Sequence, residues 1–220
     1  MRNTIQFGED VAGYNIRVLN EREIRAAAGI MFLATFISFV LILSQGNFLP
    51  IKYVITIFLM DFFIRVFVSP RLSPTLILGR LIVNRQTPEY VGARQKRFAW
   101  MVGLFLSVTM FVFMVVVNAY SPITGIVCLL CLVFLFFESA FGICLACKVY
   151  SLFNKRTVQH CPGEVCERKA RQEIQKTSVG QFLVVLGFVA CMVLLGTFFN
   201  RYYSRQPYDL FGIYAVEKNK

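Results

Sequence analysis

The chain has 220 residues, of which 57% are hydrophobic and only 16% are charged. A soluble domain of this size would be about half apolar and about a quarter charged, so the composition excludes an ordinary soluble domain. The formal net charge of +11 could suggest a nucleic-acid partner. The basic residues, however, flank long apolar segments, which is the pattern that orients helices in a membrane. The sequence therefore predicts a polytopic membrane protein that contacts the lipid bilayer and binds no nucleic acid.

The predicted fold is all-α, a bundle of five transmembrane helices with a short interfacial helix. Residues 1–23 form a polar cytoplasmic segment, which lacks the continuous apolar core of a cleavable signal peptide. The transmembrane domain covers residues 24–199, and residues 200–220 form a polar tail. Each span is expected to contain the roughly 20 residues that a bilayer requires. We place the spans at 24–43, 50–68, 98–119, 122–147 and 179–199, with a cytoplasmic cysteine-containing loop at 148–178.

Local signals support these boundaries. Asn20, followed by Glu21 and Glu23, is a typical helix N-cap with acidic residues in the first turn. The sequence SPRLSP at 69–74 stops the second span, and its last two residues then begin a new helix over 74–84. That helix is too short to span a bilayer and has arginines around it, so we place it at the membrane interface. The sequence YSP at 120–122 predicts a tight turn between antiparallel third and fourth spans.

Three ionisable side chains lie within the predicted spans: Asp61, Arg65 and Glu138. Such residues often mark an ion or proton pathway. Asp61 and Arg65 are four residues apart and share one helix face, which also fits a local ion pair with the arginine extending toward the interface. We favour the ion pair. Glu138 is expected to pair with Arg65 or to accept a proton.

The distribution of basic residues predicts the orientation. Cytoplasmic segments of membrane proteins carry an excess of lysine and arginine. The N-terminal segment, the loop after the second span and the loop after the fourth span are basic, whereas the intervening loops contribute only Lys52. The N-terminus and both basic loops are therefore expected in the cytoplasm. Four cysteines, Cys144, Cys147, Cys161 and Cys166, then lie on the reducing side, where a lasting disulfide is not expected.

One interpretation of these four cysteines is thiol exchange. A Cys-x-x-Cys pair at a helix end can cycle between dithiol and disulfide, so Cys144 and Cys147 are the expected working pair, with Cys161 and Cys166 resolving a mixed disulfide. Lys148 would favour a thiolate at Cys147. A position at a helix C-terminus would oppose it, because the helix dipole is negative there.

A second interpretation is a structural zinc site. The four cysteines have the spacing C-x2-C-x13-C-x4-C, which is close to the zinc patterns built from two cysteine pairs. His160 could replace one ligand. Bound zinc would then fix the loop to the end of the fourth span without any catalytic role.

The remaining cysteines are expected to be packing residues, since buried cysteine behaves as a small hydrophobe. Cys128 and Cys131 share a helix face with Glu138 and Gly142, where the glycine would allow close helix approach. On a continuous helix, Cys131 and Cys144 would be about 20 Å apart along the axis. This distance excludes direct exchange between the two pairs. Cys191 is expected to pack within the fifth span.

Two motifs carry a resemblance to a known family: FGICLACKVY at 141–150 and SPRLSP at 69–74. Together they resemble a bacterial inner-membrane family that is designated only as a domain of unknown function, number forty-three ninety-five. Its members are four-span bundles that end in Phe-Gly-x-Cys-x-x-Cys-x-x-Tyr, which Cys144, Cys147 and Tyr150 match. The resemblance covers residues 14–150. It implies a bacterial inner membrane and a thioredoxin-like or sulfurtransferase partner, while the fifth span and the second cysteine pair depart from it.

The leading functional hypothesis is a membrane thiol protein that exchanges electrons or sulfane sulfur with a cytoplasmic thioredoxin-like partner. The main alternative is a non-enzymatic membrane subunit with a four-cysteine zinc site. A third hypothesis is a small proton-coupled transporter that uses Asp61, Arg65 and Glu138.

Overall fold

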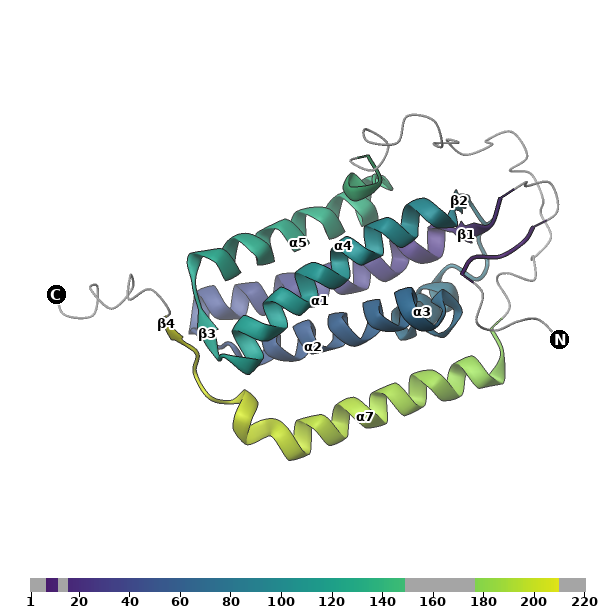
Figure 1. Cartoon of the computed structure of the whole chain (residues 1–220). Coiled ribbons are helices and arrows are strands. Elements are labelled where there is room, and N and C mark those ends of the chain that lie inside the picture. Colours follow the sequence, from purple (N-terminus) through teal and green to yellow (C-terminus); the bar gives the residue numbers. More distant parts are fainter. Residues whose placement is uncertain (1–6, 12–15, 149–176, 210–220) are drawn as a thin grey trace.

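The computed structural model describes residues 7–11, 16–148 and 177–209 (Figure 1). Four helical segments run side by side as a bundle: α1 (Glu21–Gln45), α2 (Leu49–Phe63), α4 (Ala93–Phe111) and α5 (Pro122–Phe141). A fifth long helix, α7 (Val179–Tyr203), lies alongside. Of the expected site residues, His160, Cys161 and Cys166 lie outside the described residues, as does Tyr150.

Four helices among the described residues are long and apolar enough to cross a membrane, namely α1, α4 with its continuation to Val116, α5 and α7. Their outward faces carry many exposed large apolar side chains, as expected of helices that contact lipid. The helix at the predicted second span is different, because α2 has 15 residues and continues as a five-residue π-helical turn, η1 (Ile64–Val68). The all-α expectation is thus confirmed.

The helices pack around one main apolar core. α1 packs against α5 and α3, whereas α2 packs against α4. The central side chains include Met31 of α1, Phe58 and Phe62 of α2 and Trp100 of α4. The turn between α4 and α5 is fixed by a capping box, in which Ser121 and Thr124 satisfy each other's backbone and Pro122 occupies the first turn.

The short helix after the second span is held against the protein. After the 3-10 turn η2 (Pro70–Leu72), Ser73 caps α3 (Pro74–Ile82) as the sequence predicts. Gly79 faces α1 so closely that a Cβ atom there would lie 2.5 Å from the carbonyl oxygen of Glu23. This glycine is therefore required for the contact. One face of α3 is buried on α1, while Leu81 and Ile82 are exposed on the other.

Short strands join the ends of the bundle. β1 (Val18–Asn20) pairs antiparallel with β2 (Tyr90–Gly92), next to the starts of α1 and α4. At the opposite end, β3 (Ala119–Tyr120) pairs in parallel with β4 (Tyr208–Asp209), which follows α7. Between β3 and α4 the chain passes through a second π-helical turn, η3 (Val112–Val116).

α7 is fixed to the bundle at both ends, although its apolar middle is exposed. Near its start, Gln181 Nε2 donates to the Arg71 carbonyl at 3.1 Å. At its end, Lys52 Nζ donates to the carbonyls of Tyr203 and Arg205, at 3.3 and 2.6 Å. A cation at these last carbonyls suits the negative end of the helix dipole. Lys52 is therefore buried, although the orientation argument counted it with the loop between the first and second predicted spans.

Candidate functional site

The helix that carries the cysteine pair ends earlier than the sequence predicts. α5 stops at Phe141, and Gly142 adopts a left-handed conformation with φ 66° as its C-cap. The chain then begins a new helical turn at 145–148. The expected continuous span over 122–147 is therefore wrong, because a left-handed glycine ends a helix. Gly142 serves as this stop. It also lies close to α1, since a Cβ atom there would be 3.2 Å from the Arg25 guanidinium.

This break places Cys144 at the start of the new turn. The Cys144 sulfur accepts a hydrogen bond from the Cys147 backbone N–H at 3.3 Å, in the manner of an N-cap side chain. Cys147 Sγ contacts the carbonyl oxygen of Gln95 at 3.7 Å, which ties the pair to the first turn of α4. Both cysteines are free thiols and both are half-buried. The prediction that the pair lies at a helix C-terminus is therefore wrong for Cys144.

The two thiols differ in acidity. A side-chain hydrogen bond with Cys147 lowers the pKa of Cys144, and Lys96 adds to this effect, while burial and Glu138 oppose it. The same hydrogen bond, together with burial, raises the pKa of Cys147. Because the thiolate is the nucleophile, Cys144 is the better attacking group and Cys147 holds its proton.

A buried charge cluster lies beside the cysteines. Lys96 Nζ contacts Glu138 Oε1 at 2.7 Å and Glu21 Oε2 at 2.9 Å. The three residues come from α4, α5 and α1, so the cluster joins three helices. Glu138 therefore pairs with Lys96, and the expected pairing with Arg65 is wrong. We call the end of the bundle that holds Glu21, Lys96 and Cys144 the cysteine end.

A second charge cluster lies deeper in the bundle. Arg65 Nε contacts Asp61 Oδ2 at 2.7 Å, which is the local ion pair that the sequence predicts. The carboxylate also accepts hydrogen bonds from Ser73 Oγ and from the backbone and hydroxyl of Thr75. Arg65 donates to the same two hydroxyls. The guanidinium is thus buried within the protein, so its expected extension toward the interface is wrong.

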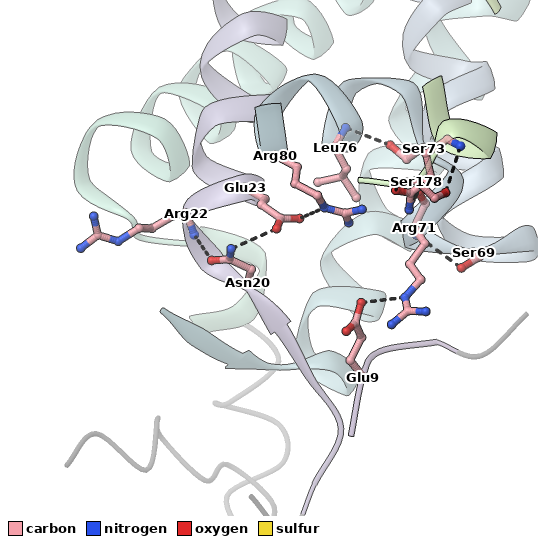
Figure 2. Close-up of polar contacts among 11 residues, drawn as sticks. Glu9, Asn20, Arg22, Glu23, Ser69, Arg71, Ser73, Leu76, Arg80 and Ser178 are labelled. Atoms are coloured by element: carbon pink, nitrogen blue, oxygen red, sulfur yellow. Dashed lines mark hydrogen bonds and ion pairs between the residues drawn. The ribbon is translucent and has the colours of Figure 1, made fainter. Parts of the chain in front are cut away.

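This second cluster explains the SPRLSP segment. Ser73 caps α3 by accepting from the Leu76 N–H at 3.3 Å, and it bridges the cap to the Asp61–Arg65 pair. Figure 2 shows the neighbouring contacts, in which Arg71 binds Glu9 at 2.6 Å and Arg80 binds Glu23 at 3.1 Å. Glu23 also accepts from Asn20, the predicted N-cap of α1.

Several residues of the site could not be assigned from the sequence. Lys96 falls within the basic loop that the sequence predicts before the third span. In the structure it belongs to α4, which begins five residues before the predicted span. Glu21 was assigned only to the first turn of α1. A period of three to four residues links Lys96 to the buried Trp100, and this periodicity was the one available signal that Lys96 faces inward.

A cavity of about 60 Å³ lies between α1, α2, α4 and α5 and reaches the cysteine end. Its lining includes Cys131 and Cys144 together with Arg65, Trp100 and Glu138. One cysteine of each Cys-x-x-Cys pair therefore borders the same space. Cys128 is buried in a separate apolar cluster with Ile51 and Met110, as expected of a packing residue.

The second ligand pair of the zinc interpretation, Cys161 and Cys166, lies outside the described residues. Within residues 7–11, 16–148 and 177–209, no group of three or more potential ligands among histidine, cysteine and acidic residues is close enough to hold a metal ion. Cys144 and Cys147 alone would supply two of the four ligands that structural zinc takes.

The fold and the site together define a class: a helical protein compatible with multiple membrane crossings, with a dithiol at a helix break beside a buried lysine. The family model described as "Domain of unknown function (DUF4395)" matches residues 19–155. The chain belongs to this family, as the motifs at 69–74 and 141–150 suggest. The match includes both charge clusters and Cys144/Cys147 and stops before α7. Neither the curated proteins nor the solved structures provided a match.

Proposed function

We propose that this chain is a membrane thiol protein in which Cys144 and Cys147 exchange electrons or sulfane sulfur with a cytoplasmic thioredoxin-like partner. The observation that carries the proposal is the hydrogen bond from the Cys147 N–H to the Cys144 sulfur at a helix break. This arrangement presents one thiol as nucleophile and keeps a second thiol beside it. Such asymmetry is what a dithiol needs in order to form and then resolve a mixed disulfide.

The exchange starts from the dithiol. The Cys144 thiolate attacks one sulfur of a partner disulfide, so a mixed disulfide forms and the partner's other sulfur leaves as a thiolate. Cys147 loses its proton and attacks Cys144, which forms the Cys144–Cys147 disulfide and releases the partner as a dithiol. Two electrons pass to the partner, and each step is reversible. With a persulfide partner, Cys144 instead takes the outer sulfur and the partner leaves as a thiolate.

The proposed setting is the inner membrane of a bacterium, crossed five times, with the N-terminus in the cytoplasm. α2 with η1 would provide the fifth crossing, since together they cover Leu49–Val68. The orientation is supported by the structure's placement of Lys52, the basic residue assigned to the outer loops. Lys52 is internal, so it does not count against a positive cytoplasmic side. Cys144 and Cys147 then face the cytoplasm.

Within this proposal, Cys161 and Cys166 serve either as resolving thiols or as zinc ligands. The transport hypothesis has less support, because Asp61 pairs with Arg65 and Glu138 pairs with Lys96. A proton or anion pathway would have to break these pairs in every cycle.

The test uses purified protein in detergent, first oxidised and then supplied with thioredoxin, thioredoxin reductase and NADPH. We expect NADPH consumption in the native chain, a complete loss in Cys144→Ser and no change in Cys191→Ser, the matched control on α7. A double Cys161→Ser/Cys166→Ser variant shows whether the second pair takes part.

Metal analysis of the same preparation separates the alternatives. One zinc ion per chain, with all four cysteines protected from alkylation until a chelator is added, would refute the thiol-exchange proposal. Metal-free protein whose Cys144–Cys147 disulfide is reduced by thioredoxin would remove the zinc site.

A further inference from the structure

The cavity at the cysteine end has features that the thiol chemistry alone does not use. It lies inside the apolar part of the bundle, and Phe58, Phe62 and Trp100 provide aromatic walls. Leu106 and Phe134, on the facing sides of α4 and α5, are only half-buried and form part of its lining. A largely apolar cavity with a few convergent polar groups is the usual form of a small-molecule site.

The polar groups of the lining are few. Arg65 is almost fully buried, and its Nε and Nη2 atoms are bonded to Asp61, Ser73, Thr75 and Met31. Its Nη1 atom makes no hydrogen bond with the residues that the structure describes. The guanidinium carbon lies 5.2 Å from the Trp100 ring centre. The cavity is therefore bordered by a buried guanidinium that stacks on an aromatic face, and Cys144 is also in its lining.

We propose that this cavity binds the ring of a lipid-soluble quinone, which oxidises the Cys144/Cys147 dithiol. A quinone ring is flat and apolar, and its carbonyl oxygens accept hydrogen bonds of the kind that Arg65 Nη1 can donate. The volume of about 60 Å³ holds about four to six water-sized groups, which suits a six-carbon ring. The alkyl tail would extend between α4 and α5, past Leu106 and Phe134.

The redox balance is complete with this oxidant. Both S–H bonds of Cys144 and Cys147 break and one S–S bond forms, which releases two electrons and two protons. The quinone takes both as O–H bonds on its two carbonyl oxygens and becomes a quinol. This inference rests on the proposed function, in that a dithiol partner then reduces the Cys144–Cys147 disulfide again. Electrons would flow from a cytoplasmic dithiol to the membrane quinone.

Trp100 allows ligand binding to be measured without any reaction. It is the one tryptophan of the chain, it lines the cavity, and quinones quench tryptophan fluorescence. The probe is a fully substituted benzoquinone with a short alkyl chain, titrated into protein in lipid nanodiscs. We expect saturable quenching in the native chain and equally in the Cys144→Ser/Cys147→Ser double variant, in which no thiol reaction can occur.

Two alanines provide a matched pair of variants. Ala99 lines the cavity, whereas Ala190 is exposed on the apolar surface of α7. Ala99→Phe should weaken the saturable quenching at least tenfold, and Ala190→Phe should leave it unchanged. Quenching that rises linearly with quinone, and equally in all variants, would show only collisions in the bilayer and would overturn the proposal.

A second measurement uses the native sequence, in case Ala99→Phe does not fold. Bound quinone should slow the alkylation of Cys131 in the cavity wall by a membrane-permeant maleimide, but not that of Cys191 on α7. Equal rates with and without quinone would also overturn the proposal. Saturable quinone binding without reduction by thioredoxin would refute only the proposed function. Thioredoxin turnover without quinone binding would refute only the cavity ligand.

Discussion

Two buried charge clusters lie within the same bundle, and they differ in how completely their charges are satisfied. Asp61 is 0% exposed and Arg65 is 3% exposed, and the carboxylate accepts from both Ser73 and Thr75 as well. In the other cluster, one ammonium group, Lys96, serves two carboxylates whose side chains remain 14% and 16% exposed. The first cluster pairs one carboxyl group with one cation away from solvent, whereas the second has two carboxyl groups for one cation and partial contact with solvent.

The difference indicates separate roles. A buried ion pair whose carboxylate is hydrogen-bonded on both oxygens is costly to break, because either partner alone is an uncompensated buried charge. The Asp61–Arg65 cluster therefore holds α2, η1 and the start of α3 in place. The Lys96 cluster has partial contact with solvent and lies beside Cys144 and Cys147, so changes in it should alter thiol chemistry more than folding. Three predictions test this comparison.

The largest effect is expected from Asp61→Asn. The substitution leaves Arg65 as a buried cation without its counter-ion, and breaking such a pair costs about 3–5 kcal/mol. The free energy of unfolding, measured by denaturant titration in micelles, should fall by this amount. Asp10→Asn is the matched control, since Asp10 pairs with Arg17 at 3.6 Å on the exposed surface, where such pairs contribute about 0–1 kcal/mol. Similar losses of unfolding free energy in both variants would show that the buried Asp61–Arg65 pair stabilises the fold no more than an exposed ion pair does.

A smaller effect, on reactivity, is expected in the second cluster, and its sign should depend on which charge is removed. Lys96 lowers the pKa of Cys144 and Glu138 raises it. Lys96→Met should therefore move the pH profile of Cys144 alkylation to higher pH, and Glu138→Gln should move it to lower pH. One pKa unit corresponds to about a tenfold change in thiolate at neutral pH. The rates can be read by mass spectrometry of the labelled peptide.

Arg94→Met is the control for charge on the same helix, since Arg94 is exposed in the first turn of α4, and it should leave the profile in place. Shifts of Lys96→Met and Glu138→Gln in the same direction would contradict the electrostatic account. Such an outcome would point to a distorted cysteine end.

The same comparison shows what the sequence could predict. Asp61 and Arg65 are four residues apart on one helix, so periodicity alone identified their ion pair. The Glu21–Lys96–Glu138 cluster joins residues that are far apart in the chain, and no local pattern pairs them. The apolar segments placed the starts of α2 and α7 to within one residue, whereas α7 continues to Tyr203, past the predicted end at residue 199. The early end of α5 was missed because the apolar sequence continues through Cys147, and only the backbone conformation of Gly142 reveals the stop.

Gly142 therefore gives the last and smallest expected effect. Its φ of 66° is a conformation that residues with a Cβ adopt at a cost, so Gly142→Ala should lower the free energy of unfolding by about 1 kcal/mol. A new Cβ would also lie 3.2 Å from the Arg25 guanidinium, a flexible group that can move away. Gly125→Ala is the control, because Gly125 lies within α5 and has no atom near its Cβ position. There alanine should stabilise the helix by about 0.5–1 kcal/mol.

For Gly142→Ala, the pH profile of Cys144 alkylation should be measured together with the free energy of unfolding. If the left-handed stop positions Cys144 as an N-cap, alanine should favour a longer α5 and weaken the hydrogen bond from the Cys147 N–H. Alkylation of Cys144 would then require higher pH, as in Lys96→Met, although no charge has changed. A stability loss with an unaltered pH profile would show that the break in α5 and the acidity of Cys144 are independent. The acidity would then depend on the charge cluster and on the side-chain hydrogen bond with Cys147.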